Sequence, residues 1–238
     1  MSSPEIEEDD IDRLRSVLPR NLEGIAFESP IDRFEEDTLS EVRLENNTPR
    51  VAEYLRGIGN KLEQLQQAPG AVGFYDLAFR LTGNKDYLML KARTLGQVGQ
   101  VDRAEHLLRR YSQENPKSPE PHYHFGKHAL SRADYQKAKE HFEAAQARIR
   151  PNNVEHRKLE AILPTYINFV SIYLDRDQIF SRDLPHEQCI KEIQRLQSRT
   201  RALAEDIRNK KITELDGMIF FLETQDKIFE KWLEEMHV

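Results

Sequence analysis

The sequence predicts an all-α protein that is built from antiparallel helix pairs and ends in a long C-terminal helical hairpin. Three observations predict it: apolar residues recur at helical spacing through most of the chain, Gly and Pro fall between these segments, and the segment 85–151 repeats itself. The 238 residues are 38% hydrophobic and 32% charged, which is typical of a helical protein with much exposed surface. This balance favours stacked helices over one thick core.

The middle of the chain matches itself when it is shifted by 34 residues. Small residues meet in this alignment, because Ala92 falls on Gly126 and Ala104 falls on Ala138. They predict a close approach of the two helices within each repeat. The four helices expected from the apolar spacing are 86–97 and 102–113 in the first repeat, and 120–132 and 136–149 in the second.

The 34-residue period, the small residues at the helix contacts, and Pro116 and Pro151 near the ends of the repeats resemble the tetratricopeptide repeat (TPR) superfamily. The chain departs from the family pattern at Leu88 and His122, where Trp is usual. The resemblance implies a right-handed superhelix of antiparallel helix pairs, in which the first helix of each pair lines a concave groove. It also implies a scaffold or adaptor rather than an enzyme.

In this register, six residues from two helices would line the groove: Met89, Arg93, Gln97, Tyr123, Lys127 and Ser131. Such a surface can hold an extended peptide or a helix, with Met89 and Tyr123 as apolar anchors and the two cations as partners for anionic groups. The alternative is that the cations are ordinary solvated charges. Binding of acidic chaperone tails is not expected, because family members with that activity carry polar or basic groups where this chain has Met89 and Tyr123.

An acidic segment precedes the repeats. Residues 1–47 contain 14 acids and 5 bases, a formal charge of −9, whereas the remainder contains 27 acids and 30 bases, or +3. We expect this arm to be partly disordered or to form short helices; the alternative is that it docks by charge on the basic body or on a partner. A helix pair within 49–83 is expected to follow it, ending at Gly83 and Asn84.

The C-terminal part predicts longer helices. A helix follows Pro151 with a kink or a break at Pro164, and a polar loop is expected over 175–183. Apolar residues then recur at the heptad spacing of a coiled coil over 186–208 and 213–236. These two segments are predicted to form a hairpin, or else one bent helix.

The last helix carries more apolar side chains than one neighbouring helix covers. Phe221, Ile228 and Trp232 widen its apolar face, and we expect them to pack on the repeats or to mediate self-association. The predicted division of the chain is therefore an acidic arm (1–47), TPR-like repeats (48–178, clearest in 85–151) and a C-terminal helical hairpin (184–238).

No residue pattern indicates catalysis, a cofactor or a metal. His124 and His128 share a helix face at ligand spacing, but a third ligand would have to come from Glu140 or His141, so we expect pH sensitivity rather than zinc binding. The single cysteine, Cys189, occupies an apolar heptad position and is expected in the core. A net charge of −6 argues against nucleic acid as a partner. No run of 18 apolar residues occurs, so no direct membrane insertion is expected, and a cytoplasmic location is predicted.

The sequence therefore predicts a non-enzymatic scaffold that binds a protein or peptide partner in its groove. The C-terminal helices would cap the array or form a homo-oligomer. The alternative is a structural subunit of a larger assembly, such as a secretion, motility or pilus apparatus, in which the convex face and the hairpin make the contacts.

Overall fold

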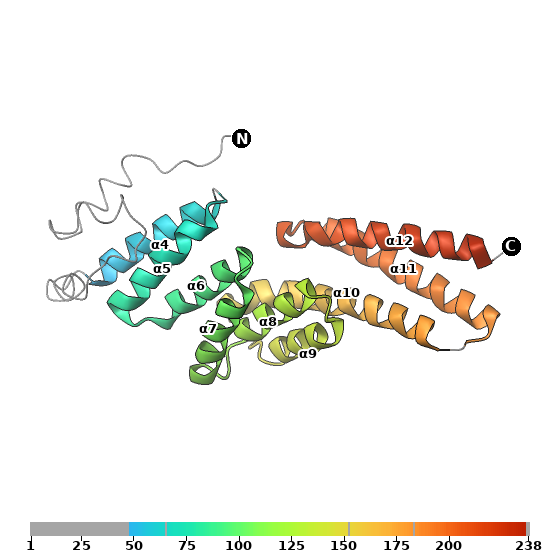
Figure 1. Ribbon diagram of the computed structural model, residues 1–238, viewed down its shortest axis with the longest axis horizontal. Coiled ribbons are helices and arrows are strands. Elements are labelled where there is room, and N and C mark those ends of the chain that lie inside the picture. The colour runs from blue at the N-terminus through green and yellow to red at the C-terminus, as the bar shows by residue number, and fades with distance from the viewer. Residues whose placement is uncertain (1–47, 65, 152, 183, 237–238) are drawn as a thin grey trace. The chain divides into compact units, whose positions relative to one another are not determined.

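The computed structural model describes residues 48–238, apart from residues 65, 152, 183, 237 and 238. Within this part of the chain every regular element is helical, and neighbouring helices pack as antiparallel pairs (Figure 1). The predicted all-α fold of helix pairs followed by a C-terminal hairpin is confirmed. The predicted acidic arm, residues 1–47, lies outside the described residues.

The helices follow one another with short connections. Their bounds are α4 (Thr48–Gln64), α5 (Ala68–Thr82), α6 (Lys85–Gln97), α7 (Val101–Glu114), α8 (Glu120–Ser131), α9 (Tyr135–Gln146), α10 (Arg157–Ser181), α11 (His186–Lys210) and α12 (Asp216–Met236), with the 3-10 turns η3 (Val154–His156) and η4 (Thr213–Leu215). The helices expected from apolar spacing in the repeats occur within a few residues of their predicted ends.

The chain divides into two compact units, residues 1–116 and 117–238. In the first unit, α4 to α7 pack in sequence, each helix against the next. Its largest fully buried side chains include Tyr75 and Leu77 of α5. Tyr75 lies directly over Gly59, where an added Cβ would come within 2.6 Å of the ring, and its hydroxyl donates to Asn60 Oδ1 at 2.8 Å. A glycine in α4 therefore makes room for the main aromatic residue of this core.

The chain reverses in this unit at residues whose conformation suits a turn. Gly83 follows α5 with φ +66°, and its N–H donates to the carbonyl of Phe79. Asn84 then caps α6, because its side-chain oxygen accepts a hydrogen bond from the N–H of Asp86 at 3.0 Å. Gly99, with φ +79°, forms the turn between α6 and α7. The predicted helix end at Gly83 is confirmed.

In the second unit, α8 to α12 pack in the same sequential way. Gly126 of α8 lies against the ring of Phe142 of α9, where an added Cβ would come within 2.5 Å. Phe142 is fully buried, and its ring centroid lies 4.8 Å from that of Tyr166 of α10. Ala138 is also fully buried. The close approach predicted from the small residues is therefore present at the α8–α9 crossing.

The helix that follows the repeats differs from its prediction. α10 is a single α-helix with Pro164 inside it, so the predicted break is wrong. Leu163 and Thr165, on either side of the proline, are almost completely buried, and this packing maintains the helix across the missing hydrogen bond. The prediction of a polar loop over 175–183 is also wrong, because α10 continues to Ser181. Ile179 holds this end of the helix by packing into a cluster with Ile193 and Leu196 of α11.

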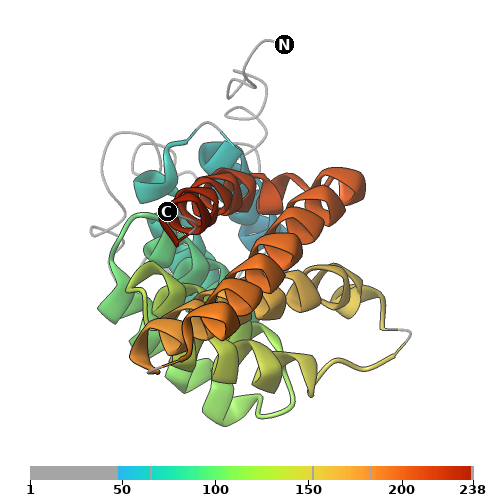
Figure 2. The same cartoon turned by 90° about the vertical axis from the view of Figure 1, so that its right-hand side faces the viewer.

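The two C-terminal helices form a hairpin rather than one bent helix. α11 and α12 pack against each other (Figure 2), and Lys211, with φ +51°, reverses the chain between them. Buried Ile193 and Phe229 lie at the interface, and Arg201 Nε donates to Asp226 Oδ1 at 2.8 Å along its edge. No helix among the described residues combines the length and apolar character that crossing a membrane requires.

Candidate functional site

The part of the predicted groove that belongs to the first unit lies on α6. Met89 is only 8% exposed, so most of its side chain is used in packing. The guanidinium of Arg93 forms an ion pair with Glu63 of α4, and the hydroxyl of Thr94 donates to the same carboxylate. Gln97 is exposed. The apolar anchor and the cation predicted here are therefore both engaged inside the unit.

The part that belongs to the second unit lies on α8 and includes Tyr123, Lys127 and Ser131. Tyr123 is 4% exposed, and its hydroxyl donates to the carboxylate of Glu214. Burial, followed by the charges and hydrogen bonds of Tyr166 and Glu214, raises the pKa of Tyr123. Lys127 Nζ lies 5.5 Å from the centre of the Tyr123 ring and 3.7 Å from Glu214 Oε1. Ser131 is exposed.

Glu214, in the turn η4 between α11 and α12, connects these groups. Its second oxygen lies 2.6 Å from Lys158 Nζ of α10. Burial acts to raise the pKa of Glu214, but the hydrogen bonds from Lys158 and Tyr123 and the charge of Lys127 outweigh burial and hold the pKa below its ordinary value. Because the adjacent Leu215 is fully buried in the core, this acid is held in place. Lys127, the predicted anion-binding residue of α8, thus lies beside a carboxylate of its own chain.

Three of the five large hydrophobic side chains that are exposed among the described residues lie on α12, and the other two are Val154 of η3 and Phe180 of α10. On α12, Phe220 is 68% exposed, Phe221 is 55% exposed and Ile228 is 37% exposed. Trp232 is partly covered by Phe180 of α10, with ring centroids 4.5 Å apart, and by Phe229, at 5.6 Å. We call Phe220, Phe221, Ile228 and Trp232 the α12 face. An exposed group of large apolar side chains is a candidate for an interaction surface.

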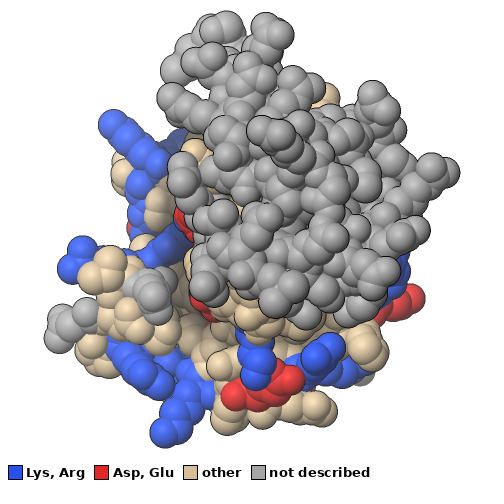
Figure 3. Space-filling model, turned by 90° about the vertical axis from the view of Figure 1, so that its left-hand side faces the viewer, with Lys and Arg blue, Asp and Glu red and all other residues tan. Residues whose placement is uncertain are grey.

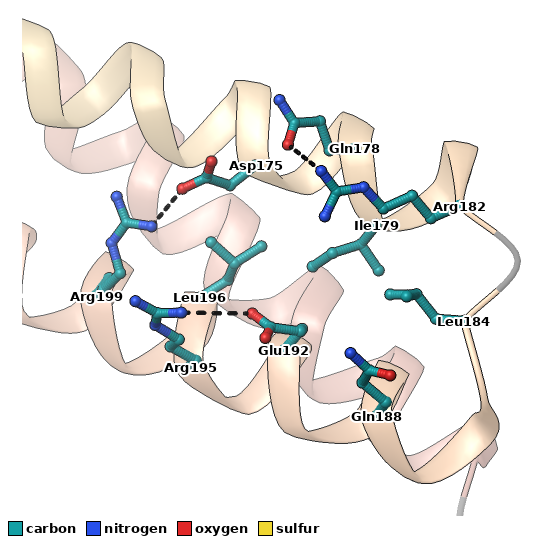
Figure 4. Close-up of a pocket in the computed structure, with 10 residues that line it drawn as sticks. All are labelled: Asp175, Gln178, Ile179, Arg182, Leu184, Gln188, Glu192, Arg195, Leu196 and Arg199. Atoms are coloured by element: carbon teal, nitrogen blue, oxygen red, sulfur yellow. Dashed lines mark hydrogen bonds and ion pairs between the residues drawn. The ribbon is translucent and has the colours of Figure 1, made fainter.

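A cavity of about 300 Å³ lies between the end of α10 and the start of α11 (Figure 4). Three arginines line it, but each already has an acceptor at its rim. Arg199 Nη1 lies 2.5 Å from Asp175, Arg195 Nη1 lies 3.8 Å from Glu192, and Arg182 donates to Gln178 at 3.2 Å. An anion that entered the cavity would compete with these two carboxylates, so the lining does not point to an anion ligand.

The histidines of α8 do not form a metal centre with their neighbours. His122 lies beside His141 of α9, with ring centroids 5.9 Å apart, and against the edge of Phe125. Burial, then the charges of Arg148 and His141, lowers the pKa of His122. In the part of the chain that the structure describes, no three His, Cys, Asp or Glu side chains group so that they could hold a metal ion.

One family model matches the middle of the chain. The sequence model of the family described as "Anaphase-promoting complex, cyclosome, subunit 3" matches residues 64–145, which span most of the helices in which the 34-residue period was found. The resemblance to the tetratricopeptide repeat superfamily is confirmed. None of the curated proteins compared with this sequence matches it significantly.

One solved structure shares the TPR-like fold over nearly the whole chain. The crystal structure of the APC/C hetero-tetramer Cut9–Hcn1 contains a chain that is similar over 95% of this one, with a TM-score of 0.50 and 15% sequence identity. The present chain spans about half of that chain, 47% of its length. At this identity the similarity concerns the fold alone.

Two residues of these surfaces were not singled out from the sequence. Glu214 lies 91 positions from Tyr123, and no local pattern marks an acid in a turn as the partner of a distant tyrosine. Phe180 was placed in a polar loop. Its spacing of seven from Tyr173 continues the apolar pattern of α10 and could have extended the helix prediction.

Proposed function

We propose that this protein is a non-enzymatic TPR-like scaffold that binds another protein through the α12 face. The exposure of Phe220 and Phe221 carries the proposal, because comparable aromatic residues such as Phe142 and Phe229 are fully buried. Burying one such side chain at an interface contributes about 1.5–3 kcal/mol. The face therefore offers a partner three large apolar side chains that the described residues leave exposed.

The predicted groove residues of α6 in the first unit, and separately those of α8 in the second unit, are further candidate surfaces. Gln97 and Ser131 are exposed, but a partner that used Arg93 or Lys127 would first have to displace Glu63 or Glu214. Breaking such a partly buried pair leaves charges uncompensated, which costs free energy. The α12 face needs no such rearrangement, and for this reason we favour it over the groove.

Membership in a larger assembly fits this choice of surface. The matching family is described as a subunit of the anaphase-promoting complex, and the similar structure is a hetero-tetramer of the APC/C. A chain of stacked helix pairs with an exposed aromatic helix suits a structural subunit, because the repeats provide a rigid support for the contact. We propose that this protein acts in that way. The other chains of its assembly are to be found by experiment.

The test compares proteins captured from a lysate of the source cells by three forms of the tagged chain. One is the natural chain, one carries Phe221→Ala and Ile228→Ala, and one carries Gln97→Arg and Ser131→Arg, which place bulk at exposed groove positions. We expect capture to be lost only with the α12 variant. Loss only with the groove variant would transfer the partner site to α6 and α8. Equal capture by all three forms would refute both surfaces.

A further inference from the structure

We infer that the partner of the α12 face is the same face of a second copy of this chain, paired antiparallel about a two-fold axis. This inference rests on the proposed function and names the partner of that surface. In such a pair, Trp232 of each copy packs over Gly217 of the other, and Phe221 packs against Ile228. The spacing of these residues along α12, the open space at Gly217 and the position of two lysines favour this pairing.

Three residues of the α12 face form a symmetric set along the helix together with Gly217. Gly217 and Phe221 are four residues apart, Phe221 and Ile228 are seven apart, and Ile228 and Trp232 are again four apart. Spacings of four and seven keep residues on one side of a helix. A two-fold axis through the midpoint of this set, between positions 224 and 225, exchanges Gly217 with Trp232 and Phe221 with Ile228. This is the self-complementarity that a two-fold interface requires, and a contact with an unrelated helix has no such requirement.

Gly217 supplies the space that this pairing needs. It is exposed, its φ is not in the left-handed region, and no atom of the described residues lies within 4 Å of the position that a Cβ would occupy. Neither a turn nor packing against the described helices therefore accounts for a glycine here, in contrast to Gly126 and Gly59, which lie against aromatic rings. A glycine lets another helix or a large ring approach the backbone closely. In the antiparallel pair that ring is Trp232 of the second copy.

The remaining exposed aromatic residue also finds a partner in this register. The two-fold operation brings Lys227 and Lys231 to the levels of positions 222 and 218, so Phe220 lies midway between them on the other copy. Both lysines are exposed. Their methylene groups can cover the ring while the ammonium groups stay in water or lie over its face. The contact occurs twice and uses Phe220, the most exposed aromatic side chain of the described residues.

The length of the contact suits a pair of helices. From Gly217 to Trp232 the face extends about 22 Å at 1.5 Å per residue. Phe180 of α10, which is 53% exposed beside Trp232, lies where it can extend the contact onto the neighbouring helix. The interface thus consists of an apolar central stripe, two lysine–aromatic contacts at its flank, and an additional aromatic residue from α10.

The first experiment measures the mass of the full chain by light scattering and sedimentation from about 1 to 100 µM. The natural chain, 27.9 kDa as a monomer, is expected to form a dimer in this range. Gly217→Leu should weaken the dimer at least tenfold, because the leucine occupies the space for Trp232, and it should leave the melting temperature unchanged or raised. Gly57→Leu is the matched control, since Gly57 is also an exposed helical glycine with no atom within 4 Å of an added Cβ. It should not affect association.

The second experiment tests the antiparallel register by disulfide trapping in a Cys189→Ala background. Phe221→Cys and Ile228→Cys chains are mixed and oxidised. The antiparallel pair predicts a cross-link between the two different variants and little cross-linking of either variant with itself. A parallel pair gives the opposite result and would overturn the inference.

Two other results would also overturn it: a monomer at every concentration, or a dimer that Gly217→Leu does not weaken. If the chain is monomeric but Phe221→Ala with Ile228→Ala still abolishes capture of another protein, the second copy is refuted as the partner while the proposed function stands. If the chain dimerises as described and captures no other protein, the inference stands, the α12 face serves self-assembly, and the proposed membership in an assembly with other chains is refuted.

Discussion

Glu214 is the residue whose removal tests most directly how the second unit is held together. Its carboxylate accepts a hydrogen bond from buried Tyr123 and forms ion pairs with Lys127 and Lys158. In Glu214→Ala the tyrosine hydroxyl loses its acceptor, which costs about 1–3 kcal/mol for a buried donor. The lysine side chains are 38% and 70% exposed, so each of those pairs contributes under about 1 kcal/mol. We expect the free energy of unfolding to fall by about 2–4 kcal/mol.

The measurement is urea unfolding followed by circular dichroism, with two variants for comparison. Glu214→Gln keeps an acceptor for Tyr123 and should cost about half as much as the alanine variant, whereas Lys158→Ala should cost under about 1 kcal/mol. A double-mutant cycle with Tyr123→Phe should give a coupling energy of about 1 kcal/mol or more. If Glu214→Ala changes stability by less than about 0.5 kcal/mol, or if the cycle is additive, the contact does not hold η4 on α8.

The same contact predicts a pH dependence. The folded pKa of Glu214 lies below its ordinary value of 4.5, so the folded protein binds fewer protons at this site than the unfolded chain does. The stabilisation is therefore complete above about pH 5 and is lost as the pH falls below 4.5 through the lowered folded pKa. The difference in unfolding free energy between the natural chain and Glu214→Gln should shrink from pH 6 to pH 3. A constant difference would contradict the assigned pKa.

Three further predictions concern packing, capping and histidine. Gly126→Ala places a methyl group against the ring of Phe142 and should lower the free energy of unfolding by about 1–3 kcal/mol. Gly217→Ala, where no described atom lies near the added methyl group, should not lower it. Thermal unfolding of the two variants tests the difference. Asn84→Ala removes the hydrogen bond that caps α6 and should cost about 1 kcal/mol, measured by urea unfolding. The folded pKa of His122 is below its ordinary value of 6.5, so the stabilisation by neutral His122 is present above pH 6.5 and is lost at lower pH. The decline in melting temperature between pH 7 and pH 5 should therefore be smaller in His122→Gln than in the natural chain.

Most of the helical architecture could be predicted because its signals are local. Apolar spacing defines each helix, and Gly83 and Gly99 mark reversals that require a positive φ. The 34-residue alignment also identified Gly126 as a contact residue, because the partner of a helix in a repeat is the helix that follows it. In each case the information lies within about one repeat of the residue concerned.

The predictions that differ from the structure concern segments whose conformation depends on residues far away in the sequence. The last turns of α10 have a mainly polar sequence, and Ile179 is buried by Ile193 and Phe229, which lie much later in the chain. In the same way, the register that placed Tyr123 and Lys127 in a groove contained no information about Glu214, 91 residues beyond Tyr123. Helical periodicity describes one helix and its neighbours, and it does not show which face the end of the chain will contact.

The contact with Glu214 also determines how experiments on the predicted groove can be interpreted. Reversing the charge of Lys127 changes a groove residue and at the same time places an anion beside Glu214, where like charges repel. Glu214 lies in η4, which leads directly into α12. A change at Lys127 would therefore also disturb the position of α12 and of the α12 face. Lost binding in a Lys127 variant could therefore arise at either surface. Gln97 and Ser131 are exposed and separate from this contact, so substitutions there isolate the groove, and a Lys127 variant is informative only beside Glu214→Gln.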